Sequence, residues 1–230
     1  MQMCLIMMTG YILACSPPVR RLLDGISGWS NPEKPWQAIV TMSLFSMIVA
    51  WFNWGTSLIA SAMLALFIVK RNPKVDYRLL IAAAYLGLGC TWHSGFTGSA
   101  PLLVATPDNF VIKAKLLDAV IPISQTILHP FNLILTLVIV VVVTIMMALM
   151  HPRPERAFIV KPELMDKLKL YEAPPKPEKF QSPSDWMNWW PGFNIILSLG
   201  GLLWLIWYFS NKGLALTLDV VNFAMRMLGI

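Results

Sequence analysis

Apolar segments separated by short polar stretches make up most of this 230-residue chain. The longest of them, residues 37–69, is interrupted at its centre by the polar sequence FNWGTS at 52–57. Each apolar arm has about 14 residues, fewer than the ~20 that a helix needs to cross the hydrocarbon core. Lys and Arg residues precede and follow the segment, and such residues are retained on the cytoplasmic side of a membrane. The pattern therefore predicts a re-entrant helical hairpin over 37–69, with its polar tip inside the membrane.

A second interrupted segment covers residues 79–104. Its length suffices to span a membrane, but its central part, residues 87–99, contains four glycines and several hydroxyl side chains, and Pro101 follows. Glycine and proline are unfavourable in a continuous helix. We therefore predict a broken transmembrane helix, in which two half-helices flank an unwound polar stretch.

The rest of the pattern completes a multi-pass arrangement. Apolar helices are predicted at 1–15 and at 131–150. The charged and proline-rich residues 151–190 have no apolar period, which is typical of a loop, here a cytoplasmic one. Residues 191–230 begin the following transmembrane helices. The fold class predicted from these segments is an all-α polytopic integral membrane protein, with residues 1–150 as its first unit.

Composition supports this class and excludes others. Hydrophobic residues make up 57% of the chain and charged residues only 13%, whereas soluble domains carry roughly 25% charge. The net charge of +6 is spread over loops and forms no basic face, so no nucleic-acid partner is expected, and the lipid bilayer is. The three cysteines include no Cys-x-x-Cys pair, so neither a disulfide framework nor a cysteine metal site is expected.

The two polar breaks carry the strongest chemical signal. The ends of half-helices present unpaired N–H groups with partial positive charge, which suit a carboxylate, and unpaired carbonyls, which suit Na⁺ or a proton-bearing partner. Glycines at the breaks allow a small ligand to approach the backbone closely. Discontinuous helices of this kind form substrate sites in transporters. The candidate substrate-binding residues are Asn53, Trp54, Gly55, Thr56, Ser57, Thr91, His93, Ser94, Gly95, Thr97, Gly98 and Ser99.

Other interpretations of these residues remain open. Both breaks can be kinks packed against neighbouring helices, with hydroxyl groups bonded to the preceding turn. His93 can relay a proton, donate to an anionic substrate or bond across helices, and a contact with substrate or neighbours is favoured over a relay because no acidic partner is visible. Trp51, Trp54 and Trp92 flank the breaks and either wall a pocket for a short acyl chain or fill space between helices.

No enzyme motif is present. The chain has no Gly-x-Ser-x-Gly, no phosphate-binding loop, no His-Glu-x-x-His and no paired carboxylates on one helix face. A membrane-embedded enzyme using His93 would require a second catalytic group at similar depth, and none is found. We therefore expect neither an enzyme nor a bound cofactor.

Several motifs together resemble one known family. They are the sequence Asn53-Trp54-Gly55, the stretch DYRLLIAAAY at 76–85, and the stretch SGFTGSAPLL at 94–103 that continues to Pro107. These motifs resemble the bacterial short-chain fatty acid transporters, which belong to a wider group of ion-coupled anion carriers. The similarity extends over nearly the whole chain and is strongest in residues 1–109.

The resemblance implies uptake of acids such as acetoacetate or butyrate across the bacterial cytoplasmic (inner) membrane, coupled to H⁺ or Na⁺. It also implies two inverted repeats, each with a hairpin and a broken helix. Residues 1–150 would then be the first transport repeat without its opening helices, and the chain an N-terminal-half fragment. The partner would be the missing C-terminal half or a second copy of the chain. The alternative is a truncated, non-transporting membrane scaffold or assembly subunit.

Overall fold

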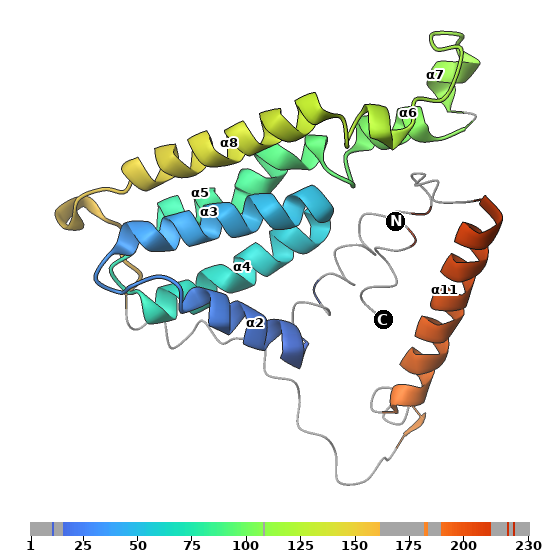
Figure 1. Cartoon of the computed structure of the whole chain (residues 1–230). Helices are drawn as coiled ribbons and strands as arrows, with labels where there is room; N and C mark the ends of the chain where they lie inside the picture. Colours follow the sequence, from blue (N-terminus) through green and yellow to red (C-terminus); the bar gives the residue numbers. More distant parts are fainter. Residues whose placement is uncertain are drawn as a thin grey trace.

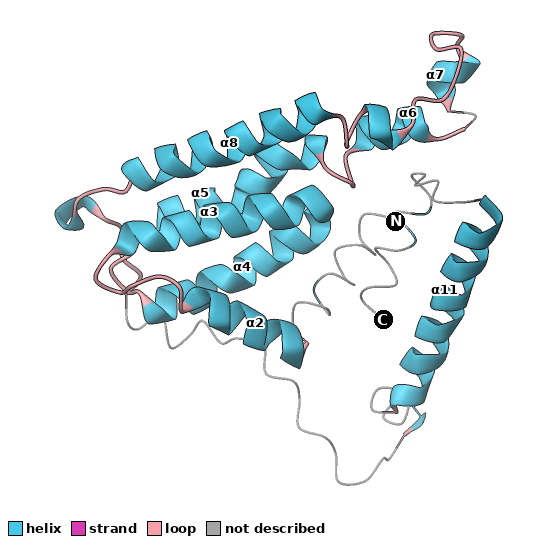
Figure 2. Cartoon of the chain, viewed as in Figure 1, coloured by secondary structure: helices cyan, strands magenta, loops and turns pink. Residues whose placement is uncertain are grey.

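The computed structural model describes residues 11, 16–107, 109–161, 182–183, 190–212, 220 and 223. These residues form helices, turns and loops, and no strand occurs among them (Figure 2). The predicted helix at 1–15, most of the predicted loop after residue 161 and most of the segment after residue 212 lie outside the described residues.

The described helices follow one another along the chain as Figure 1 shows. They are α2 (Pro17–Ser27), α3 (Pro35–Phe52), α4 (Trp54–Arg71), α5 (Tyr77–Leu86), the π-helical turn η1 (Gly87–Thr91), the 3₁₀ turn η2 (Trp92–Ser94), α6 (Ser99–Ala105), α7 (Phe110–Lys113), the 3₁₀ turn η3 (Ile123–Gln125), α8 (Pro130–Leu149), the 3₁₀ turn η4 (Pro154–Arg156) and α11 (Pro191–Lys212).

The described part of the chain contains four helical stretches that are long and apolar enough to cross a membrane: α3, α4, residues 77–113 and α8. On α8 most large apolar side chains are exposed, which is expected where a helix faces lipid. The all-helical, multi-pass fold class is thereby confirmed.

The hairpin predicted at 37–69 is present as α3 and α4, which run antiparallel and reverse at a single non-helical residue, Asn53 (Figure 1). Each arm has 18 residues, more than predicted, and is therefore about 27 Å long. The arms gain length because Pro35 starts α3 two residues early, because the polar residues 54–57 are helical, and because α4 continues through Lys70 and Arg71. At this length both a re-entrant hairpin and two full crossings are compatible with a bilayer core of ~30 Å.

The broken helix is also present, but its break is shorter than predicted. The chain stays helical through η1 and η2, and only Gly95–Gly98 is non-helical before α6 begins. The expected unwound stretch was Thr91–Ser99, so the prediction was wrong for Thr91–Ser94 and for Ser99, which begins α6. The reason is that the Trp92 N–H donates to the Gly87 carbonyl and closes a wider π-helical turn, where Thr91 Oγ1 also lies 3.2 Å from that carbonyl. The glycines widen the helix first and end it only at Gly95.

The core lies between α3, α4 and α5, with α2 and α8 packed on its outside. Helices α3 and α5 begin, and α4 and α8 end, at the same end of this bundle (Figure 1). Basic residues gather at this end, including Lys34, Arg71, Lys74 and Arg78. We call it the basic end, and it corresponds to the cytoplasmic side in the sequence-based topology.

Asp76 fastens the loop after α8 to the start of α5 at the basic end. Its carboxylate accepts hydrogen bonds from the backbone N–H groups of Leu79 (2.9 Å) and Phe158 (2.7 Å). Burial by itself raises the pKa of Asp76, but these two bonds and the attraction of Arg78 outweigh burial and hold the pKa below its ordinary value. The ionised carboxylate therefore holds the loop after α8 against the start of α5.

Candidate functional site

The tip of the hairpin is built by Asn53. Its side-chain Oδ1 accepts a hydrogen bond from the N–H of Thr56 at 3.1 Å, and its own carbonyl accepts from the N–H of Ser57 at 3.0 Å. Asparagine is among the best residues for capping a helix start because its side chain satisfies an N–H group that the helix cannot. Asn53 therefore ends α3 and begins α4, with its side chain used for structure.

The break at Gly95–Gly98 packs directly against this tip. The N–H of Phe96 donates to the carbonyl of Trp51 at 2.8 Å, which satisfies a carbonyl left free at the end of α3. The N–H of Trp54 donates to Thr97 Oγ1 at 3.3 Å. Gly95 permits the contact, since a Cβ at this position would overlap the Trp51 carbonyl group. The structure thus brings together two breaks that lie about 40 residues apart in the sequence.

Three predicted site hydroxyls are used to hold helices together. Thr91 Oγ1 donates to the carbonyl of Met47 on α3 at 2.8 Å, and Ser57 Oγ donates to the carbonyl of Ser46 at 2.8 Å. Ser94 Oγ donates to the carbonyl of Thr91, three residues earlier, at 2.9 Å. These contacts match the packing interpretation for these residues, with hydroxyls bonded across helices or to the preceding turn.

Other predicted site groups stay available. Among the described residues, no hydrogen bond engages Thr56 Oγ1, the backbone N–H of Gly55, Ser99 Oγ or the ring of His93. Gly55 is buried, Thr56 is half-buried, and His93 and Ser99 are exposed. Gly55 and Thr56 belong to the opening turn of α4, where the helix dipole favours negative charge. The arrangement can offer an anion two donors at the start of a helix.

Aromatic side chains surround the contact between tip and break. The rings of Trp51 and Phe96 meet edge to face with centroids 4.7 Å apart, and those of Trp54 and Trp92 lie 6.1 Å apart. The Trp92 ring also lies 4.6 Å from that of His93, and Trp92 Nε1 donates to the carbonyl of Thr97 at 2.7 Å. The tryptophans therefore fill space at the breaks and border them with apolar surface.

Sequence reasoning missed Asn132, which ties α8 to the break. Its amide donates to the carbonyl of Ser94 at 3.0 Å and to that of Ile127 at 2.8 Å. The signal was present, because Asn132 is the one amide side chain in the predicted helix 131–150. Ser46 was missed as well; its Oγ bonds the Ala83 carbonyl on α5 at 2.8 Å and links α3 to the broken helix.

No group of three or more His, Cys, Asp or Glu side chains lies together in the part of the chain that the structure describes.

Comparison with known proteins places the chain in a family. The sequence model described as short chain fatty acid transporter matches residues 1–230. The chain belongs to the short-chain fatty acid transporter family. This is a family of transport proteins rather than of enzymes, as the absence of catalytic motifs led us to expect.

Two bacterial relatives show how much of a family member is present. A protein of Escherichia coli K12 named "Putative short-chain fatty acid transporter" is 34% identical over 231 residues. A protein of the same name from Haemophilus influenzae is 32% identical over 234 residues. Each match covers 100% of this chain, but 50% and 51% of the relatives, so the chain spans about half their length. No solved structure matches it.

Proposed function

We propose that this chain supplies about half of a carrier that moves short-chain fatty acids, of the acetoacetate and butyrate class, across the bacterial cytoplasmic membrane. Family membership supports the substrate class, and the four membrane-spanning stretches support a multi-pass carrier. The observation that carries the proposal is the direct contact of the hairpin tip with the break, through the bonds Phe96–Trp51 and Trp54–Thr97. The partner would be the other half of the carrier, on the same chain or on another.

In this proposal the substrate carboxylate lies beside the first turn of α4. The Gly55 N–H and Thr56 Oγ1 donate to it, and the positive end of the helix dipole stabilises its charge. Ser99, Gly98 and His93 border the same contact, and the Trp54 and Trp92 rings receive the short acyl chain. Asn53, Thr91 and Ser94 then act as supports that hold this geometry.

The proposal includes cation coupling. Neither residues 53–57 nor residues 91–99 contain a Lys or Arg, so the site has no permanent positive charge of its own. A carboxylate that leaves water for this environment is unfavourable unless its charge is compensated. A co-transported proton or Na⁺ would supply that compensation, and rocking of the tip and the break together would alternate access to the two sides.

The test is uptake of radiolabelled butyrate into proteoliposomes by the chain restored to the length of its relatives, with Na⁺ and proton gradients imposed separately. Thr56→Val removes one hydroxyl without changing side-chain shape, and we expect it to raise the KM for butyrate at least tenfold. Thr41→Val is the matched control, because Thr41 Oγ1 bonds its own helix at Gln37 and lies away from the tip.

Equal KM values for the two variants would refute the assigned site. Absence of uptake by a folded, full-length protein under both gradients would refute the carrier assignment and favour a scaffold or assembly subunit. Uptake by the 230-residue chain alone would show that two copies can build a complete site.

A further inference from the structure

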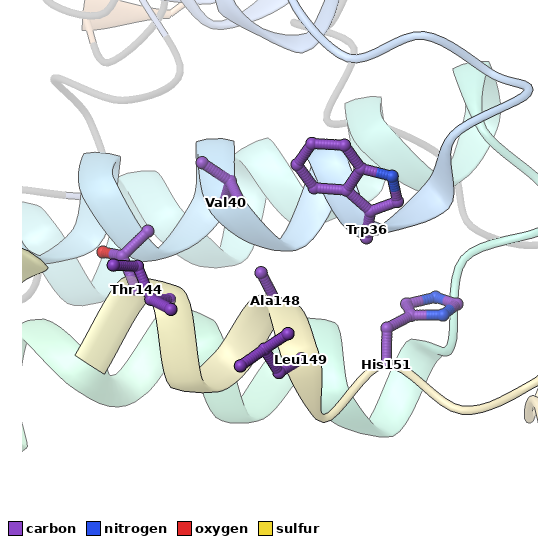
Figure 3. Close-up of a pocket in the computed structure, with 7 residues that line it drawn as sticks. Trp36, Val40, Thr144, Ala148, Leu149 and His151 are labelled. Atoms are coloured by element: carbon purple, nitrogen blue, oxygen red, sulfur yellow. The ribbon is translucent and has the colours of Figure 1, made fainter. Parts of the chain in front are cut away.

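A pocket lies at the basic end of the bundle, far along α3 from the hairpin tip. It has a volume of about 640 Å³ and opens between the start of α3 and the end of α8 (Figure 3). Trp36 and Val40 of α3 form one wall, Thr144, Ala148 and Leu149 of α8 form the other, and His151 follows at the mouth. Sixteen residues of helix, about 24 Å, separate Trp36 from Phe52, so this pocket is distinct from the proposed substrate site.

The polar character of the pocket changes along its length. Trp36 and His151 lie at one end, and Val40 and Thr144 lie at the other (Figure 3). The end formed by Val40 and Thr144 offers a single polar group, the Thr144 hydroxyl, which is buried and has no hydrogen-bond partner among the described residues. One neutral hydroxyl cannot compensate a buried charge. A ligand of this pocket therefore places an apolar chain inside and any charged group at the mouth.

The mouth is rigid and sits among basic residues. Both ring nitrogens of His151 are engaged, Nδ1 with the Pro152 carbonyl at 2.9 Å and Nε2 with the Asp76 N–H at 3.4 Å. This pairing fixes the ring at the mouth and leaves it no further hydrogen bond to offer. Contacts with a charged ligand therefore fall on the exposed cations that are nearest in sequence, Lys34, two residues before Trp36, and Arg153, two residues after His151.

These cations are not neutralised by carboxylates of the described chain. Arg71, Lys74 and Arg78 at the same end each lie within 4.0 Å of a carboxylate. No such pair is formed by Lys34, Arg153 or Arg156 among the described residues, although Glu155 lies between the two arginines in the sequence. Basic pockets between transmembrane helices on the cytoplasmic side are typical sites for the headgroups of anionic lipids.

We propose that this pocket binds one anionic phospholipid of the cytoplasmic leaflet. One acyl chain lies between α3 and α8, beside Val40 and Ala148, and the phosphate lies at the mouth against Lys34 and Arg153. The volume lies within the ~300–1,000 Å³ range typical of ligand pockets. The bound lipid joins α8 to α3 at the end where Asp76 joins the loop after α8 to α5, and so stabilises the packing of α8 on the bundle.

Native mass spectrometry of the purified chain tests this directly, with phosphatidylglycerol and phosphatidylcholine titrated in parallel. We expect the chain to bind phosphatidylglycerol more tightly. The double variant Lys34→Gln/Arg153→Gln removes the two proposed phosphate contacts and should weaken phosphatidylglycerol binding by about fivefold per removed charge, leaving phosphatidylcholine binding unchanged. The charge-matched control is Lys113→Gln/Lys115→Gln, at the end of the helical stretch 77–113. It should change the binding of neither lipid.

A second pair of variants tests the acyl-chain part of the pocket. Ala148→Phe fills the pocket and should reduce binding of both lipids, whereas Ala82→Phe adds the same ring at an exposed position of α5 and should not. Equal affinity for the two lipids, or phosphatidylglycerol binding unchanged by Lys34→Gln/Arg153→Gln, would overturn the proposal. If Ala148→Phe abolished self-association or association with the rest of the carrier and left lipid binding intact, the groove would be a protein interface instead.

Discussion

Gly95 is the position where a single methyl group should separate the break from the hairpin tip. Its backbone is extended, with φ −101° and ψ 180°, a conformation that alanine adopts without strain. A Cβ at this position would lie 2.7 Å from Trp51 Cα and overlap the Trp51 carbonyl oxygen, closer than the 3.0 Å that real Cβ contacts respect. The cost of Gly95→Ala is therefore steric, because the added Cβ meets backbone atoms of Trp51 rather than a side chain that could change rotamer.

The expected magnitude follows from the contacts that must open. Moving the break away from α3 loses the Phe96–Trp51 hydrogen bond of 2.8 Å, a net loss of roughly 1 kcal/mol. Overpacking of a close contact costs typically ~1–3 kcal/mol more. A total of about 2–4 kcal/mol corresponds to a fall of about 5–15 °C in the apparent melting temperature of a chain of this size.

The assay is thermal unfolding in detergent, followed by the amount of monodisperse protein that remains. Gly89→Ala is the matched control, because a Cβ at Gly89 meets nothing within 4 Å and alanine is the better helix residue. We expect Gly89→Ala to leave the melting temperature unchanged or slightly raised. If the two variants melted within 2 °C of each other, on the scale of ~2–4 °C per kcal/mol, the close approach at Gly95 would be wrong.

Two further predictions concern the groups that tie α8 and its loop to the rest. Asn132→Leu removes the two bonds to Ser94 and Ile127 and should lower the melting temperature by the equivalent of about 2 kcal/mol; Asn211→Leu, which loses only a bond to its own helix at Trp207, should have no such effect. Asp76 has a folded pKa below its ordinary value of 3.8, so its ionised form stabilises the folded chain at neutral pH and this contribution is lost as the pH falls through the folded pKa. Asp76→Asn should therefore melt lower than the unaltered chain at pH 7, and the difference should shrink below about pH 4 when both are followed over pH 3–7. A difference independent of pH would contradict the role of the charge.

The break positions were predictable because each has a local chemical cause. Asparagine is a preferred helix cap, which favours a break at Asn53, and Gly95 followed by Gly98 disfavours a continuous helix. Element ends were predicted less well: the hairpin arms proved about four residues longer than the apolar pattern indicated, since the polar residues 54–57 at the tip are helical and Lys70 and Arg71 remain helical as well. Polarity marks where a chain leaves the hydrocarbon, whereas hydrogen bonding decides where a helix ends.

The roles of the candidate site residues could not be predicted in the same way. Asn53, Thr91, Ser94 and Ser57 look like ligand groups in the sequence, yet each is used in a hydrogen bond within the fold. Thr56 has the same kind of side chain, and its hydroxyl remains available. The difference depends on which carbonyl lies opposite, and that is a property of helix packing.

The sequence by itself determined the membrane class, the helical segments and the two places where they are interrupted. The bilayer restricts these features strongly, because a spanning segment must be apolar and must satisfy its own backbone hydrogen-bonding groups. Tertiary structure alone decided that the breaks meet, that Asn132 fastens α8 to them, and that a pocket opens at the basic end. Those features depend on contacts between segments that lie many residues apart in the sequence. Such contacts follow from helix packing and cannot be inferred from a local sequence pattern.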